Sequence, residues 1–243
     1  MKRNSLFILL VLFPVISCAA SIDSMLGAVH FDQDNIAPAL KIFGLLTVLS
    51  LAPSLLMMLT SFTRVIVVLS MLRTALGLQQ TPPNNVLISL ALFLTLYIMM
   101  PVAKIIYDEA YIPYQQKKIT STAALEKAAE PLKKFLMRQT REKDLQLIIQ
   151  LAHEPQPMRP EQVSFYQLVP AFMLSELQSA FQIGFMIFLP FLLVDMIVSG
   201  ILVTMGMMMM PPATIALPIK ILLFVLIDGW DLIVQALVGS FHN

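Results

Sequence analysis

Charged residues are scarce in this sequence. Only 13% of the 243 residues are Asp, Glu, Lys or Arg, whereas 58% are hydrophobic, and the mean hydropathy is +0.79. A soluble domain of this size needs far more charge to remain dispersed, so lipid or a large protein assembly must cover much of its surface. The net charge of +1 offers no electrostatic basis for binding nucleic acid.

Cysteine and histidine are almost absent as well. The three histidines, His30, His153 and His242, are isolated from one another, and the single cysteine is Cys18. The sequence has no glycine loop ending in Gly-Lys-Ser or Gly-Lys-Thr and no His-Glu-x-x-His metal helix. We therefore expect no catalytic residues, no cofactor and no metal ion, so the protein is predicted not to be an enzyme.

Residues 1–20 have the composition of a cleavable signal peptide. Lys2 and Arg3 form its basic start, residues 6–16 its short apolar core, and Cys18-Ala19-Ala20 its small-residue end. About eleven apolar residues are too few for an uncleaved membrane helix, and a lipid anchor on Cys18 fits poorly with Ile16. After cleavage no thiol remains for disulfides, zinc binding or catalysis.

The first long uncharged stretches predict a hydrophobic hairpin within residues 21–107. One arm covers about residues 42–62 and the other about residues 86–103, each long enough for one crossing. The apolar pattern continues to Leu72, which predicts an overlong arm or a bend at Pro53.

A second hydrophobic hairpin is predicted within residues 170–243. Its arms cover about residues 171–204 and 213–238, joined by a turn over residues 205–212. Pro211-Pro212 at this apex matches Pro82-Pro83 at the first one, and paired prolines stop a helix and stiffen the connection.

Between the hairpins, residues 108–169 are predicted to be a soluble helical insertion. Seventeen of the 31 charged residues lie between Asp108 and Glu161. Apolar residues recur on one face of residues 131–152, and Pro131 suits a first helical turn, so this range is predicted to be an amphipathic helix. The expected fold class is an all-α membrane protein with two long hydrophobic helical hairpins and this insertion between them.

The distribution of basic residues does not follow the rule for ordinary spanning hairpins. Cytoplasmic loops are normally rich in Lys and Arg, yet the second apex has none and the first has only Arg73, whereas the insertion has nine. We interpret this to mean that the hairpins pack into a protein complex rather than crossing lipid as isolated pairs.

Several charges fall within the apolar arms: Arg64, Lys104, Asp195, Lys220, Asp228 and Asp231. A charge in an apolar setting faces a partner or a path. On one helix, Lys220 and Asp231 would share a face about 16 Å apart, so each needs a partner on another helix or subunit. Arg64, Asp195, Lys220 and Asp228 are candidates either for ion coupling or, as we favour, for ion pairs that fix assembly.

Four consecutive methionines, Met207, Met208, Met209 and Met210, are the most unusual local feature. Methionine is flexible and polarizable, and an apolar constriction excludes hydrated ions. If several copies surrounded an axis, these side chains would form a compliant pore gasket; otherwise they simply fill a turn between apolar helices.

Four segments resemble the FliP family of the bacterial flagellar type III export apparatus. They are LAPSLLMMLTSFTR at 51–64, LRTALGLQQTPPN at 72–84, PAFMLSELQSAFQIG at 170–184, and MMPP at 209–212 followed by LPIKI at 217–221 and DGW at 228–230. The resemblance covers nearly all of the chain after the signal, in the same order. Asn85, where glutamine is expected, is the one departure.

The resemblance implies a core subunit of the export gate in the inner membrane of the flagellar basal body. Such chains form a pentamer, joined by FliQ and FliR, that conducts unfolded rod, hook and filament proteins and sits largely above the plane of the membrane. It also implies the gasket role for Met207–Met210. Three alternatives remain: the related subunit of a virulence injectisome, a small-solute membrane carrier, and a scaffold without a pore.

Overall fold

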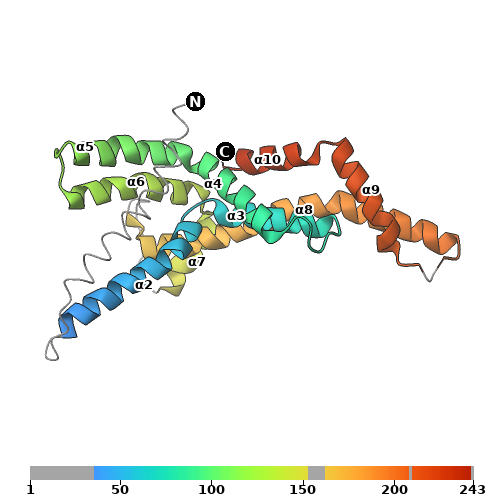
Figure 1. Cartoon of the computed structure of the whole chain (residues 1–243), viewed down its shortest axis with the longest axis horizontal. Coiled ribbons are helices and arrows are strands. Elements are labelled where there is room, and N and C mark those ends of the chain that lie inside the picture. The colour runs from blue at the N-terminus through green and yellow to red at the C-terminus, as the bar shows by residue number, and fades with distance from the viewer. Residues whose placement is uncertain (1–35, 153–161, 208–209, 242–243) are drawn as a thin grey trace. The chain divides into compact units, whose positions relative to one another are not determined.

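The computed structural model describes residues 36–152, 162–207 and 210–241, and every regular element in these ranges is a helix (Figure 1). The prediction of an all-α protein is confirmed. The predicted signal peptide, residues 1–20, lies outside the described residues. Contacts divide the chain into two units, Met1–Pro53 and Ser54–Asn243, which are described separately.

Helix α2 (Ile36–Met58) includes all of the described part of the first unit and continues through Pro53. The helix ends five residues after Pro53, so the apolar stretch that continues to Leu72 is divided between α2 and the next helix rather than forming one overlong arm. Two hydroxyls serve the backbone groups left open at this break: Phe62 N donates to Thr60 Oγ1 (3.4 Å), and Thr63 Oγ1 donates to the Met57 carbonyl (3.3 Å).

Helix α3 (Phe62–Ala75) is the centre of the main core of the second unit. It buries Val65, Val68, Leu69 and Leu72, and it packs against both α4 (Asn84–Ile106) and α8 (Phe165–Thr204). Burial of apolar surface is the dominant favourable term in folding, and α3 contributes four of the fully buried side chains of this core.

The connection from α3 to α4 is a shaped turn. Gly77 has a φ of +80°, a conformation that side chains with a Cβ rarely adopt. Arg73 Nη1 donates to the Pro82 carbonyl (3.2 Å) and to Asn84 Oδ1 (2.6 Å). The predicted double-proline apex thus lies where the sequence placed it, directly before α4.

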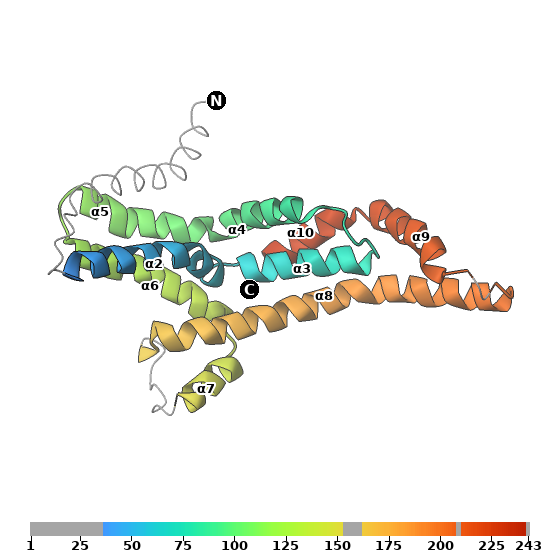
Figure 2. The ribbon, with the colours of Figure 1, turned by 60° about the horizontal axis from the view of Figure 1, so that its bottom comes forward.

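The start of the charged insertion is part of the helix that leaves the first hydrophobic region. Helix α4 continues through a π-helical turn, η1 (Tyr107–Tyr111), into α5 (Ile112–Gln115), so the chain stays helical past residue 108. Helix α6 (Ser121–Gln139) then returns antiparallel to it (Figure 2). Thr120 caps α6 by accepting a hydrogen bond from Ala123 N (3.4 Å).

The predicted single helix over residues 131–152 is wrong. Pro131 lies inside α6 rather than in a first turn, and extended backbone at Thr140 and Arg141 separates α6 from α7 (Glu142–Leu151). The break is held by α8, because Ser175 Oγ accepts from Arg141 N (3.0 Å) and donates to Asp144 Oδ2 (2.6 Å). The spacing of apolar residues within 131–152 does not predict a contact with a residue as distant in sequence as Ser175.

The second hydrophobic region consists of the 40-residue helix α8 and a bent pair, α9 (Pro212–Leu226) and α10 (Gly229–Gly239). The predicted continuous arm over residues 213–238 is wrong, because α9 and α10 meet at 66°. Asp228 adopts a left-handed conformation (φ 50°), and a Cβ on Gly229 would lie 2.2 Å from the Phe224 ring. Aspartate tolerates this conformation better than most residues.

Within the described residues, two helical stretches, Asn84–Gln115 and Phe165–Thr204, are long and apolar enough to cross a membrane; the bent pair α9–α10 makes a third if it counts as one span. Large apolar side chains are exposed along α8, including Phe185, Met186, Leu193 and Met196. Since such a surface is unstable in water, lipid or other subunits must cover it.

Candidate functional site: two buried cations and a methionine loop

Arg64 lies at the centre of a buried polar cluster, which we call the Arg64 cluster. Its guanidinium holds the Glu176 carboxylate at both oxygens, with Nε 3.0 Å from Oε2 and Nη2 bonded to Oε1. Nη1 donates to the carbonyl (3.1 Å) and hydroxyl (3.0 Å) of Ser240, and Nη2 donates to Gln139 Oε1 (3.1 Å). The guanidinium also stacks over the Phe241 ring at 3.8 Å.

The Arg64 cluster joins four parts of the second unit. Arg64 lies on α3, Glu176 on α8, Gln139 at the end of α6, and Ser240 and Phe241 just beyond α10. Because both charges are nearly inaccessible to solvent, with side-chain exposures of 4% for Arg64 and 0% for Glu176, each depends on the other for compensation. The cluster therefore fixes how these helices meet.

Sequence reasoning missed Glu176. The residue falls inside one of the segments that resemble the FliP family, yet it was not selected as a site residue. A usable signal was present: α8 carries only two charged residues, Glu176 and Asp195, in 40 positions. A carboxylate in an apolar helix requires a cation as partner. Helix α3 carries two cations, Arg64 and Arg73, and Arg64 is the one that pairs with Glu176.

Lys220 forms a second, separate ion pair. Its ammonium lies 2.7 Å from Asp195 Oδ2 and donates to the Ala75 carbonyl (3.2 Å). The pair links α9 to α8 and to the end of α3. Lys220 is buried, with 8% of its side chain exposed, whereas 40% of the Asp195 side chain is exposed. Asp195 is therefore the solvent-facing member of this pair.

The remaining predicted charges are not buried within the chain. Asp228 is exposed and occupies the corner between α9 and α10, where its backbone carbonyl accepts hydrogen bonds from Asp231 N (2.9 Å) and Leu232 N (3.3 Å). Lys220 and Asp231 do not share one helix face, as the sequence suggested, because the corner separates them. Lys104 is exposed in the last turn of α4.

The methionine loop, residues 205–211, connects α8 to α9 at the far tip of the α8–α9 pair (Figure 1). Met205, Met207 and Met210 expose 66%, 38% and 41% of their surfaces. Gly206 has a φ of +73°, which allows the sharp exit from α8. Met208 and Met209 lie outside the described residues, so half of the predicted gasket is described.

The arrangement contains charge compensation and flexible apolar surface rather than reacting groups. In the described ranges no three His, Cys, Asp or Glu side chains converge as metal ligands. The two buried cations are each held by a carboxylate and by backbone carbonyls, which orients helices against one another. The methionine loop is the exposed feature that the sequence singled out.

Comparison with known proteins identifies the relatives of this chain. A family model described as the FliP family matches residues 45–237. The chain is 53% identical over 199 residues to the flagellar biosynthetic protein FliP of Pectobacterium carotovorum, covering 82% of this chain and 77% of that protein. For the proteins of the same name, the identity is 51% over 210 residues in Bacillus subtilis (86% and 95% covered) and 45% over 235 residues in Agrobacterium fabrum (96% and 96%). The chain therefore belongs to the FliP family.

Proposed function

We propose that the chain is the channel-forming subunit of the flagellar type III protein-export gate, a multi-pass protein of the bacterial inner membrane. Several copies surround an axis and conduct unfolded rod, hook and filament proteins. The observation that carries the proposal is the exposed methionine loop at the tip of α8 and α9. Family membership and the flagellar names of its relatives support it.

The exposed apolar surface supports assembly of several copies. Helix α8 extends about 60 Å at 1.5 Å per residue, twice the thickness of a bilayer core. Part of its apolar surface must therefore be covered by protein. In the proposal the cover comes from further copies, forming a pentamer, and from FliQ and FliR.

The buried charges support a structural rather than an ion-coupling role. Arg64 and Lys220 both find carboxylates on α8 of the same chain. Each pair fixes the orientation of α8, whose end carries the methionine loop. In the proposal these ion pairs place the loop at a constant height in every copy, which a closed seal requires.

Replacing residues 207–210 by alanine tests the gasket. Shorter side chains widen the constriction without removing helix contacts, so the assembled complex should leak ions while its yield stays normal. Ion conductance is measured in cells and in reconstituted membranes containing the complete complex. Parental conductance in a fully assembled mutant complex would show that the loop is not the seal.

A control variant replaces two exposed methionines that lie within α8 rather than in the loop. Met186 and Met196 expose 69% and 76% of their surfaces but lie far along the helix from the loop. Replacing both by alanine removes two flexible apolar side chains, half as many as in the loop variant, and leaves the loop itself unchanged. The control complex should retain parental conductance.

A further inference from the structure

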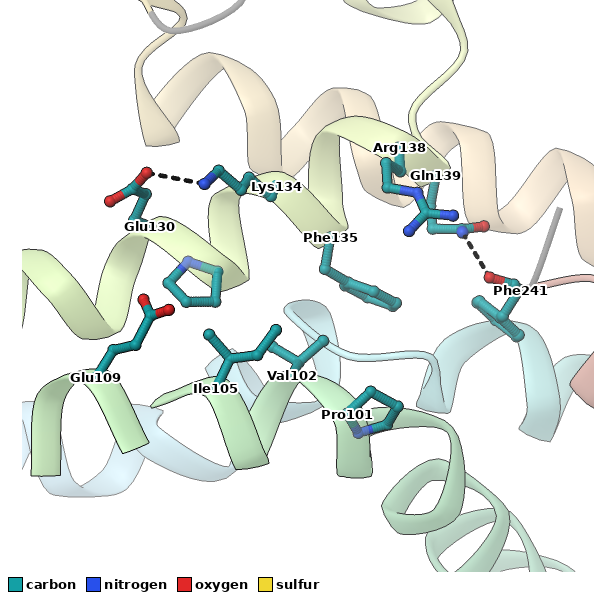
Figure 3. Close-up of a pocket in the computed structure, with 11 residues that line it drawn as sticks. Pro101, Val102, Ile105, Glu109, Glu130, Lys134, Phe135, Arg138, Gln139 and Phe241 are labelled. Atoms are coloured by element: carbon teal, nitrogen blue, oxygen red, sulfur yellow. Dashed lines mark hydrogen bonds and ion pairs between the residues drawn. The ribbon is translucent and has the colours of Figure 1, made fainter. Parts of the chain in front are cut away.

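A pocket of about 370 Å³ lies between α4 and α6, and we call it the α4–α6 pocket (Figure 3). Most of its lining residues are uncharged, and we call the apolar ones its floor; four charged residues, Glu109, Glu130, Lys134 and Arg138, also line it, and we call them its rim. The α4 side supplies Pro101, Val102, Ile105 and Glu109; the α6 side supplies Glu130, Pro131, Lys134, Phe135, Arg138 and Gln139, and Phe241 closes one end. An apolar floor with a charged rim suits an amphipathic helix.

Some charged residues at the rim form ion pairs within the chain and others do not. Lys134 lies 2.9 Å from Glu130 and lowers the pKa of that carboxyl group, by donating a hydrogen bond and by its positive charge. Glu109 takes part in no ion pair with the described part of the chain. Its carboxylate points from η1 toward α6 (Figure 3). The rim therefore offers the carboxylate of Glu109 to a cation from outside, and Arg138 is a second rim residue that takes part in no ion pair with the described residues.

The α4 side of the pocket forms a regular row. Glu109, Ile105 and Pro101 follow one another at intervals of four residues, and all three line the pocket. The step from Pro101 to Ile105 is about 6 Å along α4, and Glu109 follows in η1. The row reads acidic, apolar, apolar from the η1 end. Ile105 is 44% exposed, so this row is accessible in the chain as it stands.

Helix α7 carries the complementary row on its outer face. Leu145 and Ile149 pack inward, whereas Leu147 and Leu151 lie about 200° around the helix and are 46% and 66% exposed. Lys143 precedes them by one turn, is exposed, and takes part in no ion pair with the described residues. The outer row reads basic, apolar, apolar at intervals of four residues.

We propose that the outer row of α7 in one copy docks into the α4–α6 pocket of the neighbouring copy. With the two helices antiparallel, Lys143 meets Glu109, Leu147 meets Ile105, and Leu151 meets Pro101. The three matches follow from the common four-residue spacing and from charge complementarity.

The occupant must come from a second copy because α7 of the same chain is already placed elsewhere. It packs against α8, and none of its residues lines the pocket. A contact between two different surfaces of identical chains is head-to-tail, and such contacts form a ring when the rotation between successive copies closes. The inference rests on the proposed multi-copy gate and names one of its subunit contacts.

Cysteine cross-linking in cell membranes tests the contact in the full chain expressed with its partners. Ile105→Cys and Leu147→Cys in one chain should give an oxidant-dependent ladder of covalently joined copies, since a disulfide requires Cα atoms within about 7 Å. The matched control combines Leu147→Cys with Leu125→Cys, a residue of α6 that is 74% exposed and does not line this pocket. Neither the control nor either single cysteine should give the ladder.

A charge exchange gives an independent measurement. Glu109→Lys or Lys143→Glu alone should lower the yield of complex roughly two- to fivefold, the effect of one exposed ion pair, and the double exchange should restore it. A complex of parental mass with no ladder and no effect of either reversal overturns the docking while leaving the proposed gate intact. Failure of the parental chain to form any multi-copy complex would overturn both.

Discussion

The Arg64 cluster gives the strongest prediction for stability. Arg64 makes five hydrogen bonds and one ring contact in a site where Glu176 is completely inaccessible. Replacing Arg64 by Met leaves a buried carboxylate without its cation, which costs about 3–5 kcal/mol. For a chain of this length, each kcal/mol lowers Tm by about 2–4 °C, so the expected fall is roughly 6–20 °C.

The assay is thermal unfolding of the protein extracted in mild detergent, followed by circular dichroism. A double variant, Arg64→Met with Glu176→Met, should recover most of the loss, because apolar residues of similar volume replace a buried pair with little net change. Lys134→Met breaks the exposed pair with Glu130 and should leave Tm nearly unchanged. An Arg64→Met variant as stable as Lys134→Met would refute the reasoning.

Three further substitutions probe the helices of the second unit. Gly184→Ala should destabilise by about 1–3 kcal/mol, because the new Cβ would lie 2.3 Å from Met71 Sδ between α8 and α3. Gly200→Ala, which meets nothing within 4 Å, should instead stabilise α8 by about 0.5–1 kcal/mol; Tm measurements with the same sign at both positions would contradict this packing. Lys220→Met should reduce the yield of complex more than export per assembled complex, because it removes the bond to Asp195; normal yield with blocked export would favour ion coupling.

The break between α6 and α7 illustrates what remained invisible in the sequence. Apolar spacing over residues 131–152 is compatible with one continuous helix, and Pro131 resembles a helix start. The actual break depends on Ser175, more than thirty residues away, which binds both Arg141 and Asp144. Likewise, the corner at Asp228 depends on the Phe224 ring packing against Trp230 and Gly229.

The sequence by itself determined the helical class, the apolar character, the positions of both double-proline turns and, through its long motifs, the family. These properties follow from the amino-acid composition and from the order of neighbouring residues, both of which are fixed before the chain folds. Only the tertiary structure decided that Arg64 binds Glu176, that Lys220 binds Asp195, and that a charged-rim pocket forms between α4 and α6. Those partners lie 112, 25 and about 30 residues apart, and no local pattern specifies which groups meet when α3, α6, α8 and α9 pack.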